Sequence, residues 1–277
     1  MLIGISSSLQ HDSPAQWAEQ MVELGCRSVV FPVDYTASEH TINSYVEAAK
    51  AFQLEIAEVG IWRNPLASDA KERQEARERS VEQLRLADAI GAKCCVNIAG
   101  AVGGSRWDGG CRENFSQDAW ARTVEYSQEL IDTVNPTKTA YCLESMPWMI
   151  PDGPDAYLKM IKDVNRDAFK AHLDLVNMIT TPRRYFFISE FIQECFDKLG
   201  SYICSCHLKD IRLRQEYTFQ LEEVACGEGT LDIEKYINLA NQYNSEMPMI
   251  VEHLDTDEQY RASMKYLKER LSKQGLF

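Results

Sequence analysis

Residues 139–174 read TAYCLESMPWMIPDGPDAYLKMIKDVNRDAFKAHLD, and this stretch decides the fold. It begins with a short apolar run, continues into a segment with helical spacing of its apolar residues from 154 to 164, and ends in a second apolar run from 169 to 173. Short apolar runs are typical of buried strands, and a 3.6-residue period is typical of a helix packed on one face. The stretch therefore predicts a strand, a helix and a second strand, as in α/β proteins.

The same alternation extends in both directions from this stretch. Strands are predicted at residues 2–6, 28–32, 54–61, 93–98, 139–144, 169–173, 202–208 and 249–252. Helices are predicted at residues 14–24, 38–52, 68–90, 117–134, 154–164, 189–199, 233–241 and 256–271. Eight strand–helix units in 277 residues average about 35 residues each, which is the size expected of a (β/α)₈ barrel.

We therefore predict an α/β protein with a single TIM-barrel domain over residues 1–277. The alternative is an open, doubly wound sheet, which usually carries a glycine fingerprint after its first strand. Here that turn reads Ser6-Ser7-Ser8-Leu9. The glycine-rich loop at residues 100–110 follows the fourth strand and lacks the GxGxxG order, so we interpret it as a flexible active-site loop.

Charge and composition exclude several functional classes. The formal net charge of −13 argues against a dedicated nucleic-acid binder, because affinity for phosphate comes largely from Lys and Arg. Nine cysteines occur without any CxxC pair, the N-terminal residues resemble no signal peptide, and no stretch approaches 18 uninterrupted apolar residues. These features predict a reduced, cytoplasmic, soluble protein with neither nucleic acid nor membrane as a partner.

Four consecutive predicted strands end in residues that bind metals. The active site of a TIM barrel lies at the carboxyl ends of its strands, where this chain places Glu144, Asp174, His207 and Glu252 at separations of 30, 33 and 45 residues. Three carboxylates converging there would repel one another unless a divalent cation were bound. Oxygen-rich ligation with one imidazole suits Mn²⁺, Mg²⁺ or Co²⁺ better than a structural zinc.

Other residues near the strand ends are weaker candidates. His172 shares a face with Asp174 but lies two residues deeper, so it is either a core histidine or part of the site, and we include it among the candidate substrate-site residues. Glu58 is a further polar candidate near the end of the third strand. His253 should point away from the barrel axis, since side chains alternate along a strand.

Three residues that follow the predicted strand ends could contact a substrate. Trp107 and Trp148 lie in the loops after the fourth and fifth strands, where they would form an apolar wall for a sugar face or an aromatic aglycone, or simply pack the loops. Arg212 lies just beyond His207 and would meet a hydroxyl, carboxylate or phosphate if it faces the site. Solvation at the surface is the alternative for this arginine.

The motifs together resemble a known family. They are Leu143-Glu144, His172-Leu173-Asp174, His207-Leu208-Lys209-Asp210, the GEGTLD segment at 227–232, and Glu252-His253. This set resembles the xylose isomerase-like TIM-barrel superfamily, and within it the sugar phosphate isomerase/epimerase group that includes the tagatose and allulose 3-epimerases. The resemblance covers nearly the whole chain, but its motifs do not identify a substrate.

The resemblance implies a metal-dependent isomerase or epimerase. One divalent ion, Mn²⁺ as first choice with Mg²⁺ or Co²⁺ as alternatives, would be held by Glu144, Asp174, His207 and Glu252. The two glutamates would also act as acid and base on the carbon next to a carbonyl, while the metal stabilises the enediolate through two substrate oxygens.

The chain also departs from the epimerase pattern. Those epimerases resemble one another in an Asp-x-x-His segment, where this chain has Asn177, a residue that can hydrogen-bond a substrate but cannot titrate. They also carry an Arg and a Glu four and six residues after the first metal glutamate, where this chain has Trp148 and Ile150. This more apolar site keeps open a lyase that uses the same enolisation, of the C-glycoside deglycosidase or inosose dehydratase type.

Two other functions remain as alternatives, and the sequence also predicts a type of partner. An endonuclease IV-like DNA repair enzyme would need additional histidines and a basic surface, whereas this chain has five histidines. A metal-free binding protein that kept the barrel is the non-enzyme alternative. The expected partner is a small-molecule sugar or sugar derivative, and the sequence leaves open a homo-oligomer or a partner subunit.

Overall fold

The computed structural model describes residues 1–104, 106–273 and 275, so residue 105 of the glycine-rich loop lies outside the described part. Its main sheet consists of eight parallel strands in the order β1-β10-β7-β6-β5-β4-β3-β2. They are β1 (Leu2–Ile5), β2 (Ser28–Val30), β3 (Glu55–Gly60), β4 (Cys94–Asn97), β5 (Ala140–Glu144), β6 (Phe169–Asp174), β7 (Ile203–Leu208) and β10 (Pro248–Val251). The prediction of a TIM barrel is confirmed.

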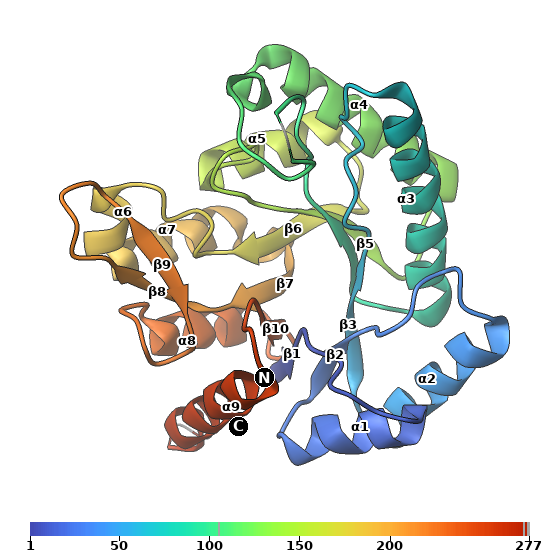
Figure 1. Cartoon of the computed structure of the whole chain (residues 1–277), viewed down its shortest axis with the longest axis vertical. Helices are drawn as coiled ribbons and strands as arrows, with labels where there is room; N and C mark the ends of the chain where they lie inside the picture. Colours follow the sequence, from blue (N-terminus) through green and yellow to red (C-terminus); the bar gives the residue numbers. More distant parts are fainter. Residues whose placement is uncertain (105, 274, 276–277) are drawn as a thin grey trace.

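Helices surround this sheet on the outside (Figure 1). They are α1 (Pro14–Glu23), α2 (Glu39–Ala51), α3 (Ala70–Ile90), α4 (Gln117–Val134), α5 (Pro154–Val164), α6 (Pro182–Phe186), α7 (Ile188–Leu199), α8 (Ile233–Tyr243) and α9 (Asp257–Ser272), with 3₁₀ turns at Arg112–Phe115 and Gly200–Tyr202. Across the described residues, no helix has both the length and the apolar character needed to cross a membrane.

The barrel is nearly closed between its first two strands. β1 and β2 form no regular ladder, but Arg27 donates its backbone N–H to the Ile3 carbonyl at 2.8 Å. The Ser28 hydroxyl donates to the Leu2 carbonyl, also at 2.8 Å. A Cβ on Gly4 would lie 2.1 Å from the Ser28 carbonyl oxygen, so glycine is required for this close approach.

Local signals explain why the predicted helix boundaries are close to the observed ones. Ser38, Asp69, Ser116 and Thr256 each cap a helix by accepting a backbone N–H in its first turn. Gly91 ends α3 in the left-handed conformation, with φ of 75°. Such caps satisfy backbone groups that would otherwise lack partners, so they fix the ends within one or two residues.

The region between the predicted strand at residues 202–208 and the predicted helix at residues 233–241 contains secondary structure that the sequence did not predict. It contains an antiparallel hairpin of β8 (Asp210–Leu213) and β9 (Leu221–Val224), which lies beside α6 on one side of the barrel (Figure 1). Short helix α6 was not predicted either. The hairpin follows the carboxyl end of β7, and the hydroxyl of Tyr185 in α6 accepts the backbone N–H of Leu213 in β8 at 3.0 Å.

A single carboxylate fixes the base of this hairpin. Asp210 Oδ1 accepts the N–H groups of Ile211 at 2.8 Å and Leu231 at 2.9 Å, while Oδ2 accepts those of Gly227 and Gly229, both at 3.0 Å. A Cβ at Gly229 would lie 2.2 Å from Oδ1, so only glycine fits there. The HLKD and GEGTLD motifs are therefore one structural device, in which the last residue of the first holds the backbone of the second.

Candidate metal centre

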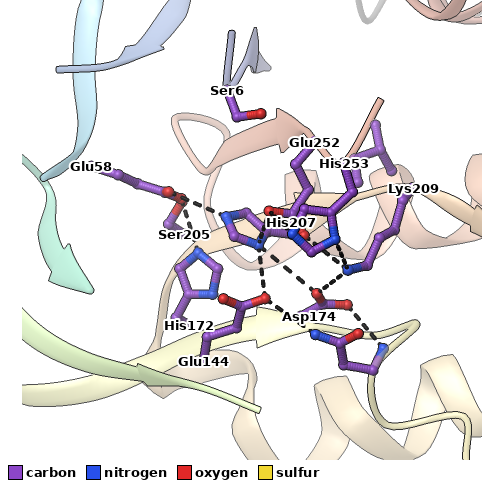
Figure 2. A network of polar contacts seen from close by, with 12 residues as sticks. Ser6, Glu58, Glu144, His172, Asp174, Ser205, His207, Lys209, Glu252 and His253 are labelled. Atoms are coloured by element: carbon purple, nitrogen blue, oxygen red, sulfur yellow. Dashed lines mark hydrogen bonds and ion pairs between the residues drawn. The ribbon is translucent and has the colours of Figure 1, made fainter. Parts of the chain in front are cut away.

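The four predicted ligands meet at the carboxyl end of the barrel. Glu144 and Asp174 are the last residues of β5 and β6, His207 is the penultimate residue of β7, and Glu252 directly follows β10. All four are buried, and one ligand atom from each lies within 4.8 Å of the others. Figure 2 shows their side chains pointing toward one another.

The His207 imidazole lies at the centre of the group. Its Nδ1 is 2.9 Å from Glu252 Oε2, 3.2 Å from Glu144 Oε1 and 3.9 Å from Asp174 Oδ2. Its Nε2 faces Glu58 Oε2 at 3.3 Å. A carboxylate behind one ring nitrogen fixes the other nitrogen in the direction of the ligands, an arrangement that recurs at metal-binding histidines.

Glu58 connects a second layer of polar residues beneath the ligands. Its Oε1 accepts hydrogen bonds from His172 Nε2 at 2.9 Å and from the Ser205 hydroxyl. Although burial acts to raise the pKa of Glu58, His172 and His207 together hold it well below its ordinary value. The sequence did not predict this contact, although inward-facing positions on β3, β6 and β7 were the available signal.

Lys209 is a buried charged residue to which the sequence assigned no role. Its side chain is 1% exposed, and its ammonium lies 2.7 Å from Asp174 Oδ2, 2.9 Å from Glu252 Oε1 and 3.0 Å from Glu223 Oε1. It lies two residues after His207, on the same side of the chain, so alternation along β7 could have identified it. The ammonium neutralises part of the charge of the ligand carboxylates.

The two glutamates have different proton affinities. Burial raises the pKa of the Glu144 carboxyl to about 7, with Glu252 and Asp174 acting in the same direction and His207 opposing them. Burial acts in the same way on Glu252, but His207 and Lys209 hold its pKa below the ordinary value. The pKa of His207 is well above its ordinary value because Glu252, Glu144 and Glu58 together outweigh its burial.

This donor set fits a divalent cation. Four buried carboxylates, those of the three acidic ligands and of Glu58, face one ammonium and the imidazoles of His207 and His172. Without a further cation the cluster keeps excess negative charge or bound protons, both of which are costly in a buried site. Three carboxylates and one imidazole are ligands that a hard or borderline divalent ion accepts.

The cluster opens into two adjoining cavities. The inner cavity, of about 360 Å³, is lined by Glu144, His207, Glu252 and Trp107, among others. The outer cavity, of about 790 Å³, lies between the loop after β5, the loop after β6 and the β8–β9 hairpin. Both are lined by Asp108, Met146 and His253, so a ligand bound over the cluster can extend from one into the other.

The outer cavity has a mainly apolar lining. Its apolar residues are Met146, Pro147, Trp148, Val176, Ile179, Ile211, Phe219 and Leu221. Its other lining residues are polar or charged, namely Arg106, Asp108, Asn177, Thr180, Glu223 and His253. Asn177 reaches back to the cluster, where its Nδ2 donates to Glu144 Oε1 at 3.2 Å and its backbone N–H donates to Asp174 Oδ1 at 3.0 Å.

The structure brings some of the predicted substrate residues together and separates others. Trp107 lines the inner cavity, and Trp148 and Asn177 line the outer one. His172 is fully buried below the ligands and lines neither of these cavities. Arg212 lies on β8 with half its side chain exposed, pairs with Glu222 at 3.2 Å, and also lines neither cavity.

The prediction that His253 points away from the barrel is wrong. Its backbone has φ of 56°, so the chain turns in the left-handed conformation directly after Glu252. The imidazole consequently lines both cavities, with Nδ1 3.0 Å from Glu223 Oε2. The hydrogen bond with Glu223 raises the pKa of His253 above its ordinary value, against the effect of burial.

Known structures share this architecture. D-psicose 3-epimerase with D-tagatose from Clostridium cellulolyticum H10 superposes with a TM-score of 0.72 at 13% identity, covering 99% of each chain. The 3-keto-D-glucoside 4-epimerase from E. coli has a TM-score of 0.70 at 14% identity, covering 97% of this chain and 99% of its own. A probable 3-DHS dehydratase from Bacillus anthracis has a TM-score of 0.73 at 17% identity, covering 97% and 98%.

Sequence comparison identifies the family of this chain but finds no individual curated relative. A search of curated proteins finds no match. By contrast, the family model described as "Xylose isomerase-like TIM barrel" matches residues 18–270, which include all four metal-ligand candidates. That span, together with a nearly closed barrel whose carboxyl end carries the candidate metal ligands, means that the chain belongs to the xylose isomerase-like TIM-barrel family.

Proposed function

We propose that this chain is a divalent-metal-dependent isomerase or epimerase that enolises a small keto-sugar or sugar derivative. The observation that carries the proposal is the convergence of Glu144, Asp174, His207 and Glu252 within 4.8 Å, on the wall of a cavity of about 360 Å³. A site of this kind offers both ligands for a metal and carboxylates for proton transfer.

These four residues would hold the ion, with Mn²⁺ as first choice and Mg²⁺ or Co²⁺ as alternatives. When bound, the ion polarises a substrate carbonyl and offsets the negative charge that develops on its oxygen. Glu58 supports this assignment because it holds the His207 ring with Nδ1 directed toward the three carboxylates.

Glu144 and Glu252 perform the proton transfers. They lie on β5 and just after β10, and β6 and β7 separate these strands in the sheet, so the two carboxyls approach the substrate from different sides of the mouth. One glutamate removes the proton from the carbon next to the carbonyl, and the other returns a proton to the resulting enediolate. Asn177 holds Glu144 by a hydrogen bond, and Lys209 holds Glu252 by an ion pair.

The test is proton exchange with solvent. Metal-supplemented protein is incubated in D₂O with a panel of ketohexoses and 3-keto-glycosides, and NMR follows deuterium at each enolisable carbon. We expect deuterium next to the carbonyl of at least one substrate, and none with Glu144→Gln or Glu252→Gln under the same conditions. The proposal fails if metal-loaded protein exchanges no carbon-bound proton in any member of the panel.

A lyase is the second candidate, and the outer cavity favours it. About 790 Å³ with an apolar lining is more space than a free monosaccharide requires, and it adjoins the ligand cluster. A sugar bound over the cluster would place an apolar substituent beside Trp148 and Phe219. After enolisation, the same intermediate can expel a substituent on the β-carbon, which gives an elimination product.

Product analysis distinguishes the two outcomes with one substrate. A 3-keto-glycoside that carries an aromatic aglycone is incubated with the metal-loaded protein. An isomerase or epimerase yields a stereoisomer or positional isomer that still carries the aglycone. A lyase yields free aglycone and an unsaturated keto-sugar. Trp148→Ala should weaken binding of this substrate more than that of a free ketohexose, since Trp148 lines the outer cavity alone.

A further inference from the structure

Three cysteine thiols meet inside the barrel, at the opposite end from the metal centre. Cys94 is the first residue of β4, Cys142 lies in β5, and Cys204 is the second residue of β7. Their sulfur atoms lie within 4.8 Å of one another, and the sulfurs of Cys142 and Cys204 are 3.0 Å apart. Cys94 and Cys142 are fully buried, whereas Cys204 is partly exposed.

A bulge in β7 explains how the third thiol reaches this place. The pairing of β6 with β7 advances from Ala171–Ile203 to His172–Ser205, so Cys204 is the additional residue. Without the bulge, strict alternation from Ser205 and His207 would place Cys204 on the outer face. A bulge re-aims one side chain, and here it turns the Cys204 thiol toward Cys142.

A disulfide does not suit this arrangement. Cys142 and Cys204 lie on strands separated by β6, so two strand spacings, on the order of 9 Å along the sheet, divide their backbones. A disulfide requires Cα atoms less than about 7 Å apart. By contrast, three sulfurs that each lie about 2.3 Å from a shared d¹⁰ cation stand about 4 Å apart. The three thiols already lie within 4.8 Å of one another, and the 3.0 Å separation of the Cys142 and Cys204 sulfurs would widen by about 1 Å as the cation binds.

The surroundings of the thiols favour a soft cation. The three sulfurs share their layer with the apolar side chains of Val96 and Ala140, and Trp62 packs against it. Hydrogen bonds from the thiols of Cys142 and Cys94 also hold the pKa of Cys204 well below its ordinary range. Soft thiolate ligands select cations such as Zn²⁺ or Cd²⁺ over the harder ions that suit the carboxylates at the mouth.

We propose that Cys94, Cys142 and Cys204 form a second metal site, which binds one thiophilic divalent d¹⁰ cation. The three thiol protons pass to solvent as the cation binds, and each sulfur becomes a thiolate ligand. The partly exposed Cys204, near the start of β7, gives access from the amino-terminal end of the barrel. The bound cation joins β4, β5 and β7 at the floor of the barrel, separately from the proposed catalytic chemistry.

Cadmium titration tests the site, because Cd²⁺ bound to thiolates gives ultraviolet charge-transfer absorption that carboxylate ligands do not. The whole chain is titrated with Cd²⁺ in excess Mg²⁺, which occupies oxygen-rich sites. We expect a signal that saturates at one Cd²⁺ per chain. Cys142→Ala and Cys204→Ala should each weaken Cd²⁺ binding at least tenfold.

Two controls separate this site from other binding. Cys95→Ala removes the thiol next to Cys94 that faces away from the cluster, and Glu144→Gln alters the mouth, so both should leave the signal unchanged. The proposal is overturned if the wild type gives no charge-transfer signal, or if the signal persists in the triple alanine variant. X-ray absorption of Cd²⁺-loaded wild type needs no variant, and fewer than three sulfur ligands would likewise overturn it.

Discussion

The mouth and the floor of the barrel share strands β5 and β7 but differ in chemistry. On β5, Glu144 and Cys142 lie two residues apart on one face, yet the first joins carboxylates and imidazoles, and the second joins thiols and alkyl groups. The mouth opens into two cavities and holds uncompensated charge, whereas the floor is compact and apolar. The position of an inward-facing residue along its strand therefore decides whether it joins the charged mouth or the apolar, thiol-lined floor.

The largest expected effect is at the two mouth glutamates. Glu144→Gln or Glu252→Gln should lower the rate of deuterium exchange by about 10²–10⁴-fold, because the amide cannot transfer a proton. The melting temperature should stay within a few degrees of the wild type, since the amide fills the same space. A rate within tenfold of the wild type would remove the glutamate from the mechanism.

Lys209→Met tests whether the buried ammonium of Lys209 neutralises the carboxylates at the mouth of the barrel. It leaves Asp174 and Glu252 without their buried ammonium, which should lower the free energy of unfolding by about 3 kcal/mol in the presence of a chelator. Excess Mn²⁺ should restore more stability to the variant than it adds to the wild type. Lys198→Met is the control, because this ammonium pairs with Asp155 and Glu194 at the surface. Equal losses in both variants would contradict the prediction.

Glu58→Gln tests the residue behind His207. Loss of the carboxylate that faces Nε2 should weaken Mn²⁺ binding by about 10–100-fold, which isothermal titration calorimetry measures without an activity assay. Ser205→Ala is the matched control, because it removes one hydrogen bond to Glu58 and keeps its charge. Equal Mn²⁺ affinity in Glu58→Gln and the wild type would show that Glu58 does not orient the ligand.

The smallest effect is expected outside the barrel interior, at the carboxylate of Asp88 near the end of α3. Its Oδ1 accepts the backbone N–H groups of Thr137, Lys138 and Thr139, just before β5. Burial acts to raise its pKa, but these N–H groups hold the pKa below its ordinary value. Asp88→Asn should cost about 0.5–1 kcal/mol at neutral pH, because solvent screens this partly exposed site.

The pH dependence of that difference follows from the direction of the pKa shift. Because the folded pKa lies below the unfolded value of about 3.9, the ionised group stabilises the fold at higher pH. The stabilisation is lost as the pH falls through the folded pKa. Urea unfolding of both proteins should therefore give a stability difference that shrinks in acid, and a constant difference would be the contrary result.

Much of the fold could be predicted because its signals are local. The caps at Ser38 and Thr256 and the stop at Gly91 depend on a few neighbouring residues, and the ligands follow from strand ends that a barrel must bring together. Glu58 and Trp148, which were weaker candidates in the sequence, also lie at the site. Glu58 contacts His207, and Trp148 lines the outer cavity.

The remaining features depend on local backbone geometry, which the pattern of residue types does not predict. The left-handed turn at His253 and the bulge at Cys204 each reverse the side that alternation predicts for a side chain. Arg212 faces solvent because the chain folds back as a hairpin after Asp210, a pairing between residues about ten apart that short, polar strands signal weakly.

The anchoring of the hairpin by Asp210 has a consequence for how this protein can diversify. The four N–H groups that Asp210 accepts belong to residues 211, 227, 229 and 231, so none lies in the tip, residues 214–220. Sequence and length at the tip can therefore change while the base stays in place. Since Phe219 in this tip lines the outer cavity, exchanging one short segment offers a route to new substrate ranges on an unchanged catalytic frame.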